Sequence, residues 1–397
     1  MGAFISWLLP IVAGLLAIPS TVLCLEVVAG VLRPQVPARP SREPRPRIAV
    51  LVPAHNESSA ITPTLDDIKP QLCPGDVLLV IADNCSDDTA TIARMSGAEV
   101  VERHDSERIG KGYALDWGLQ HIENDPPDVV VMVDADTRLA NDAIAHLVSA
   151  CSMTGRPVQS LYLMTIPDGS RINKQVAAFA WRVKNWVRPL GLKALGLPCQ
   201  LMGTGMAFPW PVIRAVDLAS GWIVEDLKLG LDLAAAGYPP LFCPSARVTS
   251  QFATSAKASA TQRKRWEQGH IMTIAKIAPR SLYTAISRGS LNLLALTLDL
   301  IVPPLSLLAM LLIFMFAITG IAALLGFGST ALIISAACLV GFATTTSLAW
   351  NEYGRDVLPA RDLWSVPLYV LAKLGLYGQI FAARKTAKWI KTDRTKN

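Results

Sequence analysis

DVVVMVDAD, residues 128–136, is the clearest structural signal in the chain. Five consecutive apolar residues lead into Asp134 and Asp136, which stand one residue apart. A short, continuously apolar run is typical of a strand buried on both faces, as in a parallel sheet covered by helices. In such sheets ligands bind beyond the carboxyl ends of the strands. This stretch therefore predicts a buried strand with two carboxylates at the edge where a site would lie.

Similar apolar runs stand on either side of this stretch along the chain. They predict further strands at residues 47–58, 76–84, 98–104 and 157–165. Amphipathic stretches lie between them, most with Ser, Asp or Asn near their starts, and these predict helices at residues 58–72, 86–97, 110–122 and 141–153. Alternating strands and helices indicate an α/β domain with a doubly wound sheet.

Two more carboxylates follow predicted strands in the same way: Glu57 and Asp83. Carboxylates one residue apart, such as Asp134 and Asp136, can bind a hard divalent cation, which in turn neutralises a diphosphate. Taken alone, such a pair more often belongs to a turn or a helix cap. Four carboxylates converging on one rim favour a site. The first strand is followed by neither a P-loop nor a G-x-G-x-x-G, which counts against an NTPase or a dinucleotide enzyme.

The composition indicates that part of the chain faces lipid. Of its 397 residues 51% are hydrophobic and 17% are charged, and the mean hydropathy is +0.36; soluble domains carry about 25% charged residues. Residues 4–32 contain one charge, Glu26, and predict a transmembrane helix within residues 1–32. A signal peptide is the alternative, but the run is longer than an h-region and lacks a basic n-region. Residues 33–47 then form a linker rich in Pro and Arg.

A second apolar region, residues 286–397, predicts a membrane-associated carboxyl-terminal part. Its predicted segments are an interfacial helix at 290–302, transmembrane helices at about 304–325 and 330–350, a further helix at 363–383 and a basic tail from 384. Because Lys373 lies in the middle of 363–383, and crossing would carry the basic tail outside, we favour an interfacial helix there over a membrane span.

The basic residues gather next to the predicted spans. The linker and the tail together carry more positive charge than the whole chain, whose net charge is +6. This pattern predicts a multi-pass protein of the inner (plasma) membrane with its α/β domain in the cytoplasm. It leaves no basic face for nucleic acid. The seven cysteines form no C-x-x-C pair, so neither a disulfide framework nor a zinc site is indicated.

Several short motifs appear in a fixed order along the chain. They are VPAHNES at 52–58, Asp83, GKGYAL at 110–115, DAD at 134–136, ED at 225–226 and QRKRW at 262–266. In this order and followed by predicted spans, they resemble the membrane-bound glycosyltransferases of family 2, in the branch of cellulose, hyaluronan and chitin synthases and related exopolysaccharide or lipid-acceptor enzymes. The resemblance covers about residues 45–385. It implies a GT-A-type domain at 48–285, built on a doubly wound mixed sheet.

The resemblance also implies roles for individual residues. Asp226 would be the catalytic base, and Asp134 and Asp136 would hold Mg²⁺ or Mn²⁺. The implied donor-binding residues are Pro53, Glu57, Asp83, Lys111, Asp134 and Arg265. The implied acceptor-binding residues are Gly203, Thr204, Gly205, Glu225, Gln262 and Trp266.

Some of these residues also have simpler interpretations. Glu225 and Asp226 could be acids that are favoured in the first turn of a helix. The basic residues of QRKRW could form a solvated helix face. The segment 201–206, which contains the three acceptor-binding candidates 203–205, could be a plain turn. The two histidines near these motifs, His55 and His270, are expected to be structural because no second ligand stands at metal-binding spacing; a role for His270 near the diphosphate stays open. The tryptophans expected in the core or at the membrane surface are Trp181, Trp186 and Trp210.

The favoured function is an inverting, metal-dependent transferase that moves a hexose from a nucleotide sugar to a membrane-associated, lipid-linked acceptor in exopolysaccharide or glycolipid biosynthesis. The expected donor is UDP-glucose or a related UDP-hexose. The expected partners are the donor, a lipid-linked or growing glycan acceptor, the bilayer and proteins of polysaccharide assembly. One alternative is a processive synthase that extrudes a polymer. Another is a non-catalytic, sugar-nucleotide-binding subunit of a synthase. A transporter is disfavoured by the large α/β domain and the few spans.

Overall fold

The computed structural model describes residues 2–32, 45–167, 172–219, 221–222, 224–253 and 255–382. Most of the predicted linker, residues 33–44, and the predicted basic tail from 384 lie outside these described residues.

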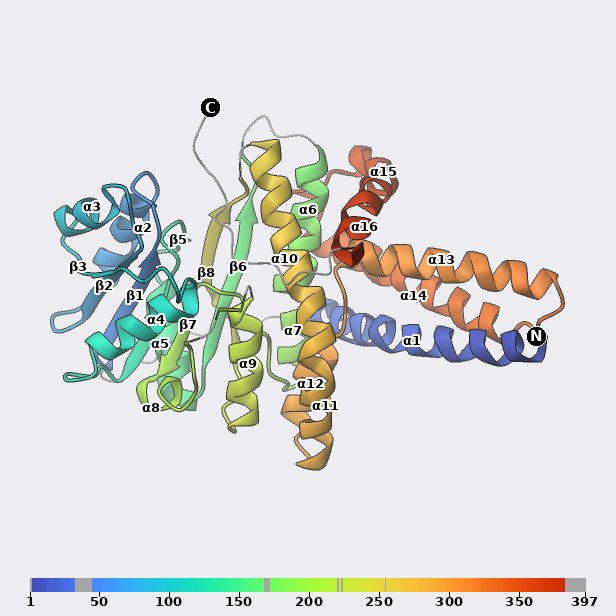
Figure 1. The fold of residues 1–397 in the computed structure, drawn as a ribbon, viewed down its shortest axis with the longest axis horizontal. Helices are drawn as coiled ribbons and strands as arrows, with labels where there is room; N and C mark the ends of the chain where they lie inside the picture. Colours follow the sequence, from blue (N-terminus) through green and yellow to red (C-terminus); the bar gives the residue numbers. More distant parts are fainter. Residues whose placement is uncertain are drawn as a thin grey trace.

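A mixed sheet forms the centre of the body (Figure 1). Within the described residues it has eight strands in the order β3-β2-β1-β4-β7-β6-β8-β5. Their bounds are β1 Ile48–Ala54, β2 Val77–Asp83, β3 Glu99–Arg103, β4 Val129–Met132, β5 Arg138–Leu139, β6 Val158–Thr165, β7 Met206–Pro209 and β8 Leu241–Gln251. The first four strands are parallel, β7 runs antiparallel to both of its neighbours, and β8 runs parallel to β6.

Helices cover both faces of this sheet. One face packs against α2 (Ile61–Ile68), α3 (Thr89–Met95) and α5 (Ala143–Thr154), and the other against α4 (Lys111–His121), α8 (Trp210–Ile213) and α9 (Glu225–Ala235). Along β1 successive side chains alternate between the two cores: Val50 enters the first and Leu51 the second. The predicted doubly wound mixed sheet is confirmed.

The sequence did not predict β5, β7 and β8. β5 has two residues and β7 has four, which is too short for a visible alternation of apolar and polar residues. β8 contains Pro244, and its pairing with β6 changes register between Ser160 and Leu161. A proline and an irregular ladder remove the continuous apolar run by which the other strands were recognised.

A second group of helices stands between the sheet and the apolar arm (Figure 1). It comprises α6 (Ile172–Arg182), a π-helical turn η2 (Val183–Val187), α7 (Arg188–Ala194), α10 (Ala256–Lys276), α11 (Ala278–Ser287) and α12 (Leu291–Leu300). α12 lies where the sequence predicted an interfacial helix at 290–302. It packs on α9 and α11 through a shared apolar cluster.

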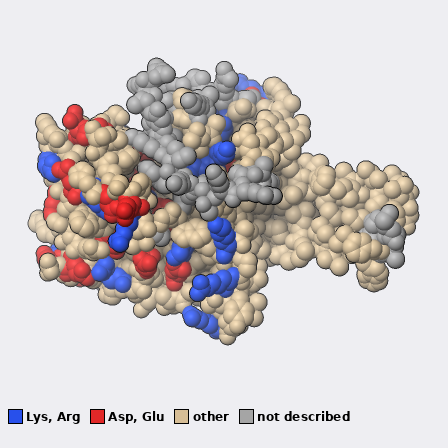
Figure 2. Space-filling view, in the orientation of Figure 1, with Lys and Arg blue, Asp and Glu red and all other residues tan. Residues whose placement is uncertain are grey.

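Three apolar helices form an arm that projects from the body: α1 (Gly2–Leu32), α13 (Leu305–Leu324) and α14 (Thr330–Tyr353) (Figure 1). Among the described residues, these three helices are long and apolar enough to cross a membrane. The face seen in Figure 2 carries charged side chains over the body but none along the arm. Large apolar side chains such as Trp7 and Leu324 are more than three quarters exposed there, as expected for surfaces that meet lipid.

The segment predicted as one helix at 363–383 is broken at Lys373. A short 3₁₀ turn, η3 (Ala360–Asp362), leads into two helices, α15 (Ser365–Ala372) and α16 (Leu374–Ala382). Another 3₁₀ turn, η1 (Lys69–Gln71), lies in the body after α2. Helices α15 and α16 have eight and nine residues, whereas a span needs about 20. The Lys373 ammonium pairs with Glu267 of α10, and both side chains are only 12% exposed.

The arm is joined to the body at a close crossing of α1 and α7. A Cβ on Gly191 of α7 would lie 1.7 Å from the backbone oxygen of Glu26, so only glycine permits this approach. At the crossing, Arg188 pairs with Glu26 of α1 at 2.6 Å and also with Asp299 of α12. All three side chains are less than 10% exposed. One guanidinium thus ties a transmembrane-length helix to two helices of the body.

Replacing Arg188 by Met is expected to destabilise the protein by about 3–5 kcal/mol, because it leaves buried carboxylates without their cation. The measurement is thermal or denaturant unfolding in one detergent. Arg214→Met is the matched control, since Arg214 pairs with Glu123 at the surface and such pairs contribute less than about 1 kcal/mol. Equal stabilities of the two variants would contradict the expected role of Arg188.

Candidate active site

A cavity of about 280 Å³ opens at the carboxyl ends of β1, β2 and β4. It lies where doubly wound sheets bind their ligands. The predicted site residues that line it are Pro53, Glu57, Asp83, Lys111, Asp134, Asp136, Gly203, Glu225, Asp226, Gln262, Arg265 and Trp266. The structure thus brings together residues that are more than 200 positions apart in the chain.

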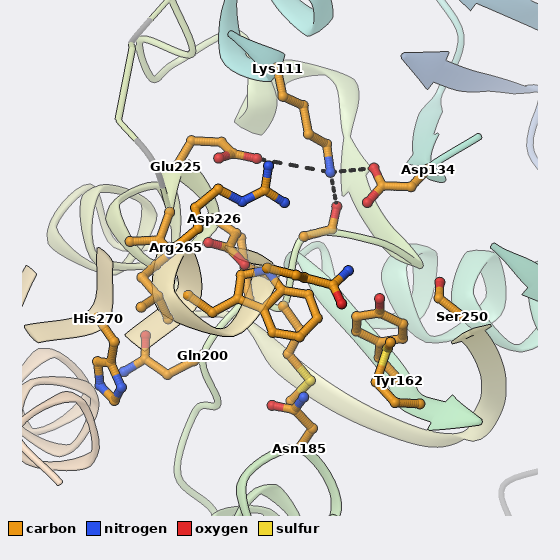
Figure 3. A pocket seen from close by; sticks show the side chains of 18 of the residues that line it. Lys111, Asp134, Tyr162, Asn185, Gln200, Glu225, Asp226, Ser250, Arg265 and His270 are labelled. Carbon is orange, nitrogen blue, oxygen red and sulfur yellow. Dashed lines mark hydrogen bonds and ion pairs between the residues drawn. The ribbon is translucent and has the colours of Figure 1, made fainter. Parts of the chain in front are cut away.

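Lys111, the first residue of α4, stands at the centre of the acidic groups (Figure 3). Its ammonium pairs with Asp134, donates to the backbone oxygen of Gly203 at 2.6 Å and lies 3.9 Å from Glu225. Burial opposes its charge, but the Asp134 and Glu225 carboxylates outweigh burial and raise the pKa of Lys111. The cavity therefore contains a fixed cation, which would favour the binding of a diphosphate.

Glu225 and Asp226 begin α9 and lie on the other side of Lys111 (Figure 3). Burial raises the pKa of Glu225 to about 7, against the opposing charge of Lys111. Burial also raises the pKa of Asp226, although Lys111 and Lys184 oppose that shift. Carboxyl groups tuned toward neutral pH can exchange protons with a substrate under physiological conditions. The position of both acids in the first turn of α9 agrees with the simpler interpretation. Because both also line the cavity, they are placed to act on a substrate as well.

Asp83 is held in place at the end of β2. Its Oδ1 accepts hydrogen bonds from Arg103 at 2.7 Å and from Asn84 at 3.1 Å. His55 Nδ1 donates to the backbone oxygen of Asp83 at 2.7 Å, which agrees with the structural role predicted for that histidine. Asn84 and Asn56 have φ values of 51° and 55°, so the chain turns sharply where each strand ends.

Asp134 and Asp136 both line the cavity directly after β4. Among the residues that the structure describes, no cluster of three or more His, Cys, Asp or Glu side chains could hold a metal ion. A cation such as Mg²⁺ is commonly held by one or two carboxylates while phosphates of the substrate and water supply the remaining ligands. The two aspartates therefore fit a metal that binds together with a nucleotide.

Thr204 and Gly205 lie behind the cavity wall instead of lining it, unlike Gly203. Thr204 is fully buried, and its Oγ1 accepts a hydrogen bond from the backbone N–H of Asp134 at 2.9 Å. A Cβ on Gly205 would lie 2.1 Å from Oγ of Ser160. The structure places Thr204 as a support for the Asp134 turn and Gly205 at a tight contact between strands, and neither is positioned to touch an acceptor.

The face of α10 that borders the cavity carries Gln262, Arg265 and Trp266, whose spacing places them on one side of a helix. Gln262 is 2% exposed, and its Oε1 has no hydrogen-bond partner among the described residues. A buried, unpaired amide oxygen costs free energy unless a ligand supplies a donor. One turn after Trp266, His270 Nε2 donates to the backbone oxygen of Leu300 at 3.0 Å. Burial lowers the pKa of His270 to about 3, which supports its structural interpretation.

The sequence profile described as "Glycosyltransferase like family 2" matches residues 44–269, more than half of the chain. The chain belongs to glycosyltransferase family 2. The matched region contains most of the residues that line the cavity, among them Lys111, Asp134, Asp136, Glu225, Asp226, Gln262, Arg265 and Trp266.

Known proteins similar to this family 2 chain include "Probable glycosyltransferase YdaM" of Bacillus subtilis (strain 168), 26% identical over 58% of this chain and 57% of that protein. The 4,4'-diaponeurosporenoate glycosyltransferase of Staphylococcus aureus (strain USA300) is 34% identical over 27% of this chain and 29% of its own. The chain thus spans only part of the length of these curated relatives, 57% of the first and 29% of the second. Among solved structures, the mannosyltransferase PcManGT from Pyrobaculum calidifontis, in complex with GDP-Man and Mn²⁺, aligns with 89% of this chain and 100% of its own at a TM-score of 0.51 and 18% identity. That likeness supports the GT-A fold.

Several side chains that line the family 2 cavity were not predicted, among them Trp181, Tyr162 and Gln200. Trp181 packs against the core as expected, yet it also lines the cavity, with its ring 4.9 Å from Trp266 and 5.3 Å from Tyr162. Gln200 lines the cavity with an Oε1 that has no partner among the described residues. The two other tryptophans considered, Trp186 and Trp210, do not line it. No motif marks Trp181 or Tyr162, because their position depends on how α6 packs on β6.

Proposed function

We propose that the chain is an inverting, metal-dependent hexosyltransferase that moves a hexose from UDP-glucose or a similar UDP-sugar to a membrane-associated, lipid-linked acceptor in exopolysaccharide or glycolipid biosynthesis. One observation supports this proposal above others. The paired carboxylates Asp134 and Asp136, the cation Lys111 and the acids Glu225 and Asp226 share one cavity. Arg188 also lines this cavity and pairs with Glu26 of the arm helix α1.

The donor nucleotide is proposed to bind along the ends of β1 and β2. Pro53 and Glu57 would flank the ribose, and Asp83 would accept a hydrogen bond from the base. Uracil offers a single ring N–H, and both protein hydrogen bonds to Asp83 go to Oδ1, so Oδ2 is suited to accept it. Lys111 and Arg265 would bind the diphosphate, for which their charges are complementary.

Asp134 and Asp136 are the residues proposed to hold Mg²⁺ or Mn²⁺. The bound cation would supply Lewis-acid stabilisation of the departing nucleoside diphosphate. The mannosyltransferase PcManGT, which shares the fold, was solved with Mn²⁺, in agreement with this choice of metal.

Asp226 is proposed to act as the general base. It would take the proton of an acceptor hydroxyl while that oxygen bonds to the anomeric carbon of the hexose. The bond from the anomeric carbon to the diphosphate breaks in the same displacement, and the nucleoside diphosphate leaves with the electron pair. A single displacement inverts the anomeric configuration. Gly203, Glu225, Gln262 and Trp266 would position the acceptor, since an indole face packs well against a sugar ring.

The arm supports the proposed location. We propose that α1, α13 and α14 cross the inner (plasma) membrane and that the domain at 48–285 lies in the cytoplasm. In this arrangement residues 1–32 form the first span, and residues 286–397 form a carboxyl-terminal membrane region in which α12, α15 and α16 lie along the interface. The active-site cavity would then open close to the bilayer surface, where a lipid-linked acceptor arrives.

A donor screen tests the proposed function. Detergent-purified protein with Mn²⁺ is given UDP-glucose, other UDP-hexoses or GDP-mannose, with and without a crude lipid extract, and nucleoside diphosphate release is measured. The expected result is UDP release that the lipid extract accelerates. Release of GDP without UDP would overturn the donor assignment, and a non-catalytic subunit would release neither.

The pH dependence of transfer should follow the buried acids. Because the pKa of Glu225 is raised to about 7 and the Asp226 pKa is also raised, the pair holds a proton in acid and loses it as the pH rises. The rate kcat/KM is expected to fall by about tenfold per pH unit below pH 7, with an apparent pKa that belongs to the pair. Glu225→Gln should move this acidic limb to lower pH. An unchanged limb in that variant would show that Glu225 is not part of the titrating pair.

A further inference from the structure

A second cavity, of about 480 Å³, lies where the base of the arm meets α6, α10 and α15. Its volume falls within the range of about 300–1,000 Å³ that is usual for sites of drug-sized ligands. Apolar side chains dominate its wall, among them Leu23, Phe179, Leu305, Phe342, Trp350 and Val366. All three helices of the arm thus line this second cavity, to which the proposed function assigns no ligand.

This second cavity adjoins the active site. The residues that line both cavities are Trp181, Lys184, Arg188, Trp266 and His270. The rings of Trp181 and Trp266, whose centroids are 4.9 Å apart, form part of the shared wall. A molecule in the second cavity would therefore end at the tryptophans that border the acceptor side of the active site.

Lys184 brings a positive charge to this junction. Its side chain is accessible and lines both cavities, and it has no hydrogen bond or ion pair within the part of the chain that the structure describes. The nearby Arg188, by contrast, is neutralised by Glu26 and Asp299. Burial lowers the pKa of Lys184, and Asp226 opposes that shift only from a longer range, so a bound anion would stabilise the charged form. A cation without a partner in a mostly apolar hollow favours a ligand with a negative charge.

The apolar wall favours a hydrocarbon chain over a glycan. Sugar hydroxyls placed against Phe179, Phe342 and Val366 would lose water without gaining hydrogen bonds, which costs free energy. A hydrocarbon chain in the same place would bury apolar surface on both sides and bind favourably. The cavity is thus unsuited to a growing polysaccharide and suited to a lipid.

We propose that the second cavity binds the hydrocarbon chain of the acceptor, an anionic lipid whose charged headgroup lies at Lys184 and whose hydroxyl reaches Asp226 past Trp181 and Trp266. This inference rests on the proposed function and makes it more specific. It assigns the acceptor as an amphiphile, with its chain beside the arm and its hydroxyl-bearing, anionic head in the shared wall.

Photo-crosslinking of the unmodified protein tests the site directly. The probe is a lysophosphatidic acid with a diazirine in its acyl chain, and the labelled peptides are mapped by mass spectrometry. The expected labels lie on α6, on α15 and on the part of α14 around Phe342 and Trp350, and unlabelled lysophosphatidic acid should compete. Labels spread evenly over the outer surface of the arm, without competition, would overturn the proposal.

A cavity-filling variant provides the second test. Ser347 lines the second cavity, whereas Thr344, three residues earlier on α14, does not. Ser347→Trp is expected to reduce labelling at α6 and α15 by about tenfold, since the indole occupies the space of the chain, and Thr344→Trp should leave it unchanged. Binding of UDP to both variants shows that they are folded. Equal labelling of the two variants would contradict a chain in this cavity.

The charge of the headgroup is tested with a pair of probes. Wild-type protein should bind lysophosphatidic acid about tenfold more tightly than the uncharged monoacylglycerol with the same chain, as expected for a charge-assisted contact. Lys184→Gln should abolish this preference, and Lys276→Gln, at an exposed position on α10, should preserve it. A preference that survives Lys184→Gln would remove Lys184 from the headgroup site.

Donor hydrolysis separates this inference from the proposed function. Slow release of UDP to water requires the active site but no lipid, so Ser347→Trp should retain it while losing transfer to lipid. If wild-type protein neither binds nor hydrolyses any nucleotide sugar, the proposed function fails. If hydrolysis is normal and the second cavity takes no lipid probe, only the acceptor inference fails.

Discussion

Asp226→Asn is expected to lower the rate of sugar transfer by about 10²–10⁴-fold, the usual contribution of a general base. Asparagine has nearly the same shape but cannot take up a proton, so binding of the UDP-sugar should change little. The measurement is kcat for transfer to lipid together with the Kd for UDP. This combination separates loss of the base from loss of the donor site.

Asp232→Asn is the matched control for this variant. Asp232 lies on the same helix, α9, and pairs with Lys228 away from the cavity. Transfer by this control should stay close to the wild-type rate. If Asp226→Asn also transfers sugar at nearly the wild-type rate, Asp226 is not the base and the simpler interpretation as a first-turn acid holds.

Asp136→Asn is expected to weaken the Mn²⁺-dependent part of UDP binding by at least about 100-fold, because losing a metal ligand costs more than the roughly 10–100-fold that follows from losing a residue that merely orients one. In wild-type protein, removing Mn²⁺ with EDTA should weaken UDP binding to a similar degree. The measurement is calorimetric titration of UDP with Mn²⁺ and with EDTA.

Asp142→Asn provides the comparison for Asp136. Asp142 is exposed, follows β5 and does not line the cavity. Binding of UDP by the Asp142→Asn variant should therefore remain fully sensitive to EDTA. In Asp136→Asn, EDTA should have almost no further effect. If that variant responds to EDTA as strongly as the wild type, the metal is held elsewhere.

The residues at the edge of the sheet could be predicted from the sequence, because each buried strand is visible as a short apolar run. β1, β2 and β4 are buried on both faces and therefore continuously apolar, and parallel strands bring their carboxyl ends to one edge. Glu57, Asp83, Asp134 and Asp136 accordingly line one cavity. The family resemblance added Lys111, Asp226 and the α10 motif, whose positions no local rule could supply.

The remaining features depend on packing between distant segments. Trp181 reaches the cavity because α6 lies against β6, and Thr204 turns inward because its hydroxyl accepts from the backbone of Asp134. The break at Lys373 accompanies its pairing with Glu267, 106 residues away. Contacts between distant segments produce no repeating pattern of apolar and polar residues in the sequence. The predictions for Trp181, Thr204 and Gly205 were therefore incomplete.

The anomeric configuration and length of the product test the central proposal most directly. Protein reconstituted in vesicles is supplied with UDP-glucose, in which the glucose is α-linked, Mn²⁺ and lipid extract, and the glycolipid product is analysed by NMR and mass spectrometry. Inverting single addition through Asp226 predicts one β-linked hexose on each acceptor lipid. An α-linked product would contradict the single displacement, and a long polymer made by this protein alone would contradict transfer to a lipid acceptor.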